Sequence, residues 1–121
     1  MRRILCLATI TVVGVLLTVV TNEARQTRHR IRPLELADNL YMLTSDPAEQ
    51  GMRTGGNTAV FVTSTGVALV DTKISGYGQD ILAEARKITD KPVTTIINTH
   101  THWDHSGANT EFPDTVDFVA H

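Results

Sequence analysis

The sequence predicts an α/β domain in which a mixed, largely antiparallel sheet carries one long helix and a second short one. Three observations favour this class. Short apolar segments alternate with turn residues through the middle of the chain, an amphipathic helix pattern follows them, and a β-branched run comes after the helix. One long helix covers only one face of such a sheet, so the chain is interpreted as the first half of a larger domain.

The first pair of strands is expected on either side of Asp38 and Asn39. Residues 34–36 and 40–43 are apolar segments. Asp and Asn tolerate the left-handed backbone that a tight turn between two strands requires. These segments therefore predict a β-hairpin.

A second hairpin is expected around a turn at residues 64–66, with strands at residues 58–63 and 67–72. The segment before it, residues 46–56, is rich in glycine and contains a proline, so it is expected to be a loop. The centre of this loop, near Met52, either closes over a substrate or simply connects the two hairpins. The second interpretation is favoured.

The long helix is expected between the second hairpin and Pro92. Its apolar face comprises Ile81, Leu82, Ala85 and Ile88. Asp80 lies near its positive end and Lys87 near its negative end, as the helix dipole favours, and Pro92 enforces its stop. Residues 93–97 are a β-branched run typical of a strand buried on both sides, and residues 116–120 predict a last strand.

Composition excludes several classes of protein. The 121 residues include eleven Lys and Arg against thirteen Asp and Glu, a formal net charge of −2. No nucleic-acid partner is expected, because phosphate binding normally requires a basic excess. The single cysteine, Cys6, permits no internal disulfide and no cysteine-based zinc ribbon. No nucleophile elbow and no phosphate-binding glycine motif occurs.

The N-terminus has the organisation of an export signal. Residues 4–20 form an uncharged apolar run after two arginines, and polar residues follow. Residues 1–24 are therefore expected to be a signal peptide, which makes the protein periplasmic or secreted, or else an N-terminal membrane anchor. Residues 25–33 are interpreted as a basic linker, although an uncleaved run would hold this basic side in the cytoplasm. Residues 34–121 are assigned to the domain.

The chemistry is concentrated in a short segment after the β-branched run. It contains four side chains whose lone pairs bind borderline metals: His100, His102, Asp104 and His105. For a chain of this composition, the pattern arises by chance in about 1 of 2000 sequences. A solvated polar turn is the alternative, and the density of ligand types disfavours it.

The spacing of these side chains predicts two metal positions. In an extended segment, residues i and i+2 point to one side, so His100 and His102 can chelate one ion. A turn at Trp103 directs Asp104 and His105 toward a second position. Each pair falls short of the three protein ligands that catalytic zinc normally has, so further ligands must come from outside the segment. Trp103 either lines the mouth of the site or anchors the turn.

The strings NTHTHWDHSGAN, GGNTAVFV and VALVDT resemble the metallo-β-lactamase superfamily. The signature of this family is His-x-His-x-Asp-His at the end of a strand, and the resemblance covers about residues 34–121. It implies the N-terminal half of an αβ/βα four-layer sandwich that binds two zinc ions. It places His100 and His102 in the first zinc site and Asp104 and His105 in the second.

The resemblance also assigns residues that support or complete the site. Asp71 matches an upstream aspartate that supports the ligands without binding metal. The family's third histidine of the first site, its bridging aspartate and its last histidine of the second site have no counterpart here. His121 and His29 are weak candidates for these positions.

The activity that the resemblance implies is hydrolysis of a small-molecule substrate. A metal-bound hydroxide attacks a carbonyl or other ester-type centre, and Asp104 orients this hydroxide as the catalytic residue. The isolated chain is expected to be inactive, because the remaining ligands are missing from it. Two alternatives stay open: a non-catalytic truncated metal-binding module, and a membrane-anchored partial domain that docks on a separately made second half.

Overall fold

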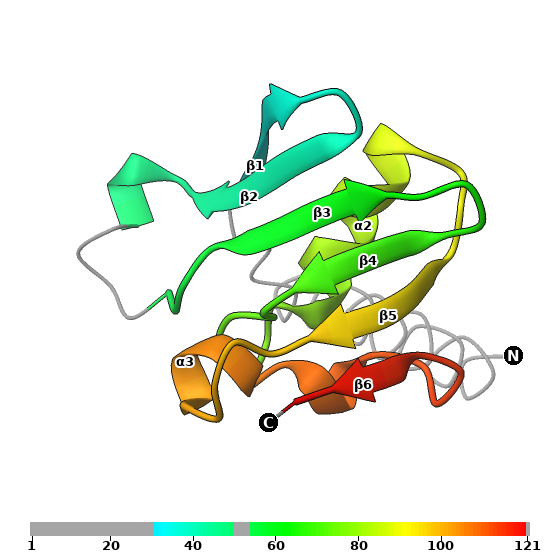
Figure 1. Ribbon diagram of the computed structural model, residues 1–121. Coiled ribbons are helices and arrows are strands. Elements are labelled where there is room, and N and C mark those ends of the chain that lie inside the picture. Colours follow the sequence, from blue (N-terminus) through cyan, green and yellow to red (C-terminus); the bar gives the residue numbers. More distant parts are fainter. Residues whose placement is uncertain (1–30, 50–53, 121) are drawn as a thin grey trace, which may run out of the picture.

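The computed structural model describes residues 31–49 and 54–120 and shows one twisted sheet with α2 packed behind it (Figure 1). The elements in chain order are β1 (Ile31–Ala37), β2 (Leu40–Ser45), η1 (Pro47–Glu49), β3 (Thr58–Val62), β4 (Val67–Val70), α2 (Gly78–Ile88), β5 (Val93–Ile97), α3 (Trp103–Ser106), η2 (Asn109–Glu111) and β6 (Asp117–Val119). The expected mixed sheet with one long and one short α-helix is confirmed.

The six strands lie in the sheet in the order of the sequence. Strands β1 to β4 pair antiparallel, whereas β5 is parallel to β4 and β6 is parallel to β5. Helix α2 connects β4 to β5, because parallel neighbours need a crossover connection. Because the two strands are parallel, the carboxyl ends of β4 and β5 lie side by side at the same end of the sheet.

Both predicted hairpins form. Asn39 adopts the left-handed conformation, with φ 61°, in the turn between β1 and β2. The second hairpin pairs Val62 with Val67 across its turn. Strand β1 begins at Ile31, earlier than residues 34–36 suggested, because Ile31, Arg32 and Pro33 also pair with β2.

The predicted face of α2 packs on the sheet. Ile81 and Ala85 are buried, and Leu82 and Ile88 are partly buried against the same core. Burial of this stripe stabilises the helix, whose N-terminus receives no side-chain cap from Tyr77. The sheet supplies the other side of the core through Leu43, Val60, Val67, Leu69 and Ile96.

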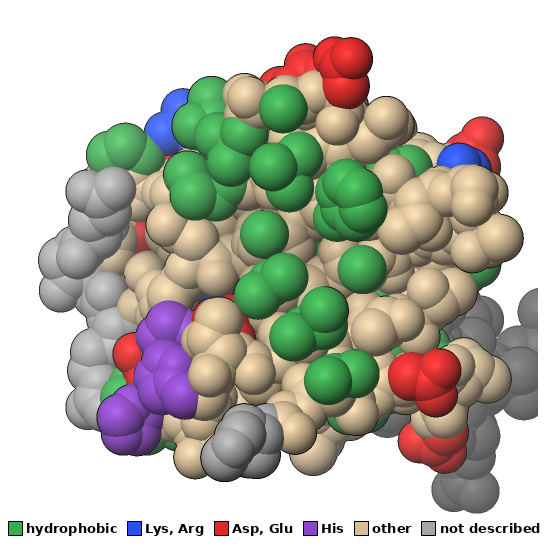
Figure 2. All heavy atoms as spheres, in the orientation of Figure 1, with side chains coloured by type: hydrophobic (Ala, Val, Ile, Leu, Met, Phe, Trp, Pro, Cys, Tyr) green, Lys and Arg blue, Asp and Glu red, His purple; other side chains and the backbone are tan. Residues whose placement is uncertain are grey.

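No described element covers the opposite face of the sheet. Paired residues form one apolar row on this face across all six strands: Leu34, Met42, Ala59, Val70, Ile97 and Val119. Figure 2 shows hydrophobic side chains gathered on this face. The expectation that residues 93–97 are buried on both sides is wrong, because Ile96 is buried toward α2 whereas Ile97 is 39% exposed.

Several expectations lie outside the described residues: the signal peptide or anchor at residues 1–24, most of the basic linker, Met52, His29 and His121. Within the described part of the chain, no helix combines the length and the apolar character needed to cross a membrane.

Candidate metal centre

Two loops at one edge of the sheet build the site. Asp71 follows β4, and the segment from His100 to His105 follows β5, whose carboxyl end lies beside that of β4. Backbone hydrogen bonds join the loops: the Thr72 N–H donates to the carbonyl of His105 at 2.7 Å, and the Gly107 N–H donates to the carbonyl of Lys73 at 3.0 Å. Residues far apart in the sequence are thereby held at fixed positions.

The loop after β4 has an unusual backbone. Asp71 and Lys73 both adopt positive φ, at 61° and 63°. Non-glycine residues adopt this conformation at a cost, and it persists where surrounding contacts enforce it. Here the Asp71 N–H donates to the carbonyl of Ile97 at 2.9 Å, and the Thr72 hydroxyl donates to the Asn109 side chain at 2.7 Å. The strained loop directs the Asp71 carboxylate toward the histidines.

Asp71 is the buried acceptor of the site. One of its oxygens, Oδ1, accepts from the Thr99 N–H at 2.8 Å. The other, Oδ2, lies 2.8 Å from both the Thr99 hydroxyl and Nδ1 of His105. Burial alone would raise the pKa of Asp71, but the hydrogen bonds from Thr99 and His105 outweigh it and hold this pKa below its ordinary value. Asp71 is therefore an ionised carboxylate that anchors neighbouring side chains.

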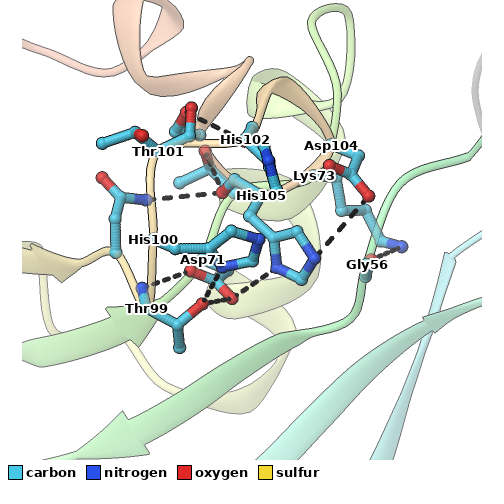
Figure 3. Close-up of polar contacts among 12 residues, drawn as sticks. Gly56, Asp71, Lys73, Thr99, His100, Thr101, His102, Asp104 and His105 are labelled. Carbon is cyan, nitrogen blue, oxygen red and sulfur yellow. Dashed lines mark hydrogen bonds and ion pairs between the residues drawn. The ribbon is translucent and has the colours of Figure 1, made fainter.

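The candidate ligands converge above Asp71 (Figure 3). One ligand atom from each of His100, Asp104 and His105 lies within 4.8 Å of the others. Nε2 of His105 is 3.7 Å from Oδ2 of Asp104. The His102 ring stands edge-on to that of His100, with 4.7 Å between centroids, while the His100 and His105 centroids are 4.2 Å apart.

The arrangement differs from the two expected pairs. His100 forms one cluster with Asp104 and His105, whereas the predicted ligand His102 lies outside this group and its ring contacts that of His100. Because Asp71 engages Nδ1 of His105, the Nε2 lone pair is the one left for a metal. Imidazoles with one carboxylate are a donor set that suits zinc and other borderline divalent ions.

Gly55 and Gly56 pack closely beside the metal-binding side chains. The Gly56 N–H donates to the carbonyl of Asp104 at 2.9 Å. A Cβ atom at Gly56 would lie 2.8 Å from Cε1 of His105, and Gly55 has φ 75°. The sequence predicts only that these glycines lie in a loop, whereas Gly56 packs against the His105 ring and Gly55 against the backbone of Asp104 and Ile74.

Sequence reasoning missed two residues that support the site. Thr99 links Asp71 to the histidine segment, and its only sequence signal was its place next to His100 in the string NTHTH. Lys73 is fully buried, and its ammonium donates to the carbonyl of Gly56 and the hydroxyl of Ser45. Trp103, for which two roles were open, is 52% exposed beside the cluster and is not a buried anchor.

Comparison with known proteins gives a consistent result. The sequence model of the Metallo-beta-lactamase superfamily matches residues 51–121. BJP-1, a subclass B3 metallo-beta-lactamase of Bradyrhizobium japonicum, is similar at 28% identity and a TM-score of 0.54, over 73% of this chain and 31% of that one. No curated protein matches the chain.

Two further solved structures share the fold. A metallo-beta-lactamase from Erythrobacter litoralis is 27% identical, with a TM-score of 0.55, over 66% of this chain and 36% of its own. One from Pontibacter korlensis is 19% identical, with a TM-score of 0.64, over 75% of this chain and 43% of its own. The chain thus spans less than half the length of each of these three solved structures.

Proposed function

The chain belongs to the metallo-beta-lactamase superfamily, and on that premise we propose that it carries part of the metal centre of a zinc-dependent hydrolase. In this proposal His100, His102, Asp104 and His105 are the metal ligands and Asp71 supports them. The observation that carries the proposal is the convergence of ligand atoms from His100, Asp104 and His105 within 4.8 Å.

The donor set supports zinc. A catalytic zinc takes three protein ligands of this kind and leaves a further position open, where it acts as a Lewis acid and lowers the pKa of water. The chain's own residues supply binding and orientation. Asp71 holds Nδ1 of His105, so that the ring presents Nε2 toward Asp104. Asp104, whose carboxylate is partly exposed beside the ligands, is proposed to orient the attacking water.

A small-molecule substrate with a carbonyl or other ester-type centre is the proposed target. The similarity to the subclass B3 enzyme BJP-1 makes a chromogenic β-lactam the first substrate to test. Because fold alone does not define substrate, thioesters and lactones belong in the same screen. We also propose that the isolated chain does not turn over substrate, because the third histidine of the first site, the bridging aspartate and the last histidine of the second site, which the family resemblance implies, have no counterpart in it.

Zinc binding by the 121-residue chain tests the proposal. His105→Ala is expected to lower zinc affinity by more than about 100-fold, because loss of a ligand costs more than the loss of a residue that supports one. The measurement is competition with a chromogenic chelator, and Asp114→Ala, a change at an exposed carboxylate outside the cluster, is the control. Equal affinities for the wild-type chain and His105→Ala would contradict the assignment of the site.

The coding sequence beyond His121 tests the activity itself. An open frame that supplies a further histidine, an aspartate and a final histidine supports the hydrolase, and the longer product is then assayed on the substrate screen. A stop codon directly after His121 contradicts hydrolysis by this product. β-Lactam turnover by the chain alone, abolished by a chelator and by His102→Ala, would contradict only its proposed inactivity.

A non-catalytic metal-binding module is the second candidate. The observation that favours it is that the described residues bring together a single group of metal-binding side chains, His100, Asp104 and His105, and not two. Zinc binding without turnover, in a product that ends at His121, supports this candidate. A membrane-anchored partial domain that docks on a separate second half predicts instead that co-expression with that half restores turnover.

Export of the protein is proposed from the apolar run at residues 4–20 after Arg2 and Arg3. A processed, shorter chain in the periplasm or medium supports a signal peptide. An unprocessed chain in the membrane fraction supports an anchor.

A further inference from the structure

Thr99 joins the Asp71 carboxylate to a second histidine. Its hydroxyl lies 2.8 Å from Oδ2 of Asp71 and 2.9 Å from Nδ1 of His100. Its N–H donates to Oδ1 of the same carboxylate at 2.8 Å. Figure 3 shows Thr99 beneath the His100 ring, beside Asp71. His105 reaches Asp71 directly, so one carboxylate contacts both histidines, once directly and once through a hydroxyl.

The available donors and acceptors define the direction of the two hydrogen bonds that join His100, Thr99 and Asp71. A hydroxyl has a single proton, and an ionised carboxylate can only accept. The Thr99 proton therefore goes to Asp71, which leaves the hydroxyl oxygen to accept from His100. Nδ1 of His100 must then carry a proton, and the Nε2 lone pair of the ring is left for a metal. His105 has the same arrangement, because its Nδ1 also donates to Asp71.

We propose that Thr99 is a positioning residue that extends the Asp71 carboxylate to His100, so that one buried group sets the tautomer of two metal-binding imidazoles. The inference rests on the proposed function only in treating these rings as zinc ligands. It assigns Thr99 no contact with substrate. It predicts that the hydroxyl matters while the methyl group does not.

The tautomers of the metal-free chain give the first test. Nitrogen-15 NMR of the imidazoles, at a pH where they are neutral, is expected to show the proton on Nδ1 of both His100 and His105. Thr99→Val removes the hydroxyl at nearly constant volume and is expected to abolish the preference at His100 while leaving it at His105. Thr99→Ser is expected to keep both. A wild-type His100 with its proton on Nε2 overturns the proposal, whether or not any variant folds.

Zinc affinity gives the second readout. Thr99→Val is expected to weaken binding about 10-fold, at the lower end of what loss of a supporting hydrogen bond to a ligand costs, and Thr99→Ser is expected to bind as the wild type does. Thr101→Val, the same change two residues further along, is the matched control. Unchanged tautomer and affinity in Thr99→Val overturn the proposal. If both change as expected but the longer gene product hydrolyses no substrate of the screen, the positioning role stands and the hydrolase proposal fails.

Discussion

Lys73 is a positive charge in the interior of the protein. Its ammonium is fully buried, lies 5.5 Å from the centroid of the Tyr77 ring, and donates to Ser45 and to Gly56. Burial lowers the pKa of Lys73 to about 8, and the negative charge of Glu49 opposes this shift only in part. By donating to the carbonyl of Gly56, this buried cation holds in place the glycine that packs against the His105 ring.

The lowered pKa of Lys73 predicts how stability changes with pH. Between about 8 and 10.5, its ordinary pKa, the unfolded chain binds a proton that the folded chain has lost. The free energy of unfolding therefore rises with pH across this window, by up to about 3 kcal/mol. Chemical denaturation at a series of pH values is expected to show this rise in the wild type and in Lys87→Met, but not in Lys73→Met. Parallel curves for all three chains would show that Lys73 titrates normally.

At the scale of elements, the start of α2 depends on a residue from another segment. The helix has no side-chain cap from Tyr77, the residue before it. Instead Glu111 in η2 accepts from the N–H groups of Gly76 and Gly78, at 2.5 and 2.8 Å, and from the hydroxyl of Ser75 at 3.0 Å. A carboxylate near the positive end of a helix is also favoured electrostatically. Glu111 therefore ties α2 to the segment that follows the metal-binding loop.

Removal of this carboxylate is expected to destabilise the domain. Glu111→Ala should lower the free energy of unfolding by about 1–2 kcal/mol, as loss of a helix cap does. Asp114→Ala, a change at a nearby exposed carboxylate, is the control and should have little effect. Urea denaturation of the three chains measures the difference. A Glu111→Ala chain as stable as the control would mean that water replaces the cap at no cost.

The elements that the sequence predicted well are those with local signals. The left-handed turn at Asn39 and the apolar stripe of α2 depend on residues close in the chain, and both are found. The metal-binding segment was equally visible, because its ligand types are dense. The exposure of Ile97 was missed because a β-branched run has the same appearance whether one or both faces of its sheet are covered.

Apart from the contact of Asp71 with the metal-binding segment, which the family resemblance implied, contacts between distant segments could not be predicted. Thr99 and Asp71 are 28 positions apart, and only the parallel pairing of β4 with β5 places them together. Lys73 occurs in the sequence as an ordinary basic residue, and its burial depends on how the loop after β4 packs under Gly56. Glu111 likewise acts on a helix that begins far upstream. In each case the local pattern carries no information about the partner.

At the scale of the whole molecule, the sheet has one packed face and one open face. The αβ/βα sandwich expected for the family places a second layer over such a face, and the solved relatives are long enough to provide it, since this chain spans only 31–43% of those described above. On the open face Leu34, Phe61 and Val119 are each about half exposed, and large contiguous apolar patches are rare on monomeric soluble proteins. Among the described residues, this open face is therefore a surface that is expected to associate with other apolar surfaces.

This asymmetry predicts the behaviour of the 121-residue chain in solution. Leu34 and Phe61, 51% and 48% exposed, are expected to drive self-association and binding of a hydrophobic fluorescent dye. Leu34→Glu with Phe61→Glu should reduce dye fluorescence several-fold and shift sedimentation toward monomer, because a charge on this face must be solvated. Ala83→Glu on the exposed side of α2 is the control and should change neither.

Zinc affinity should be the same in all of these chains, since the metal-binding cluster lies on loops at the edge of the sheet. A wild-type chain that is monomeric and binds no dye would show that another part of the protein already covers this face.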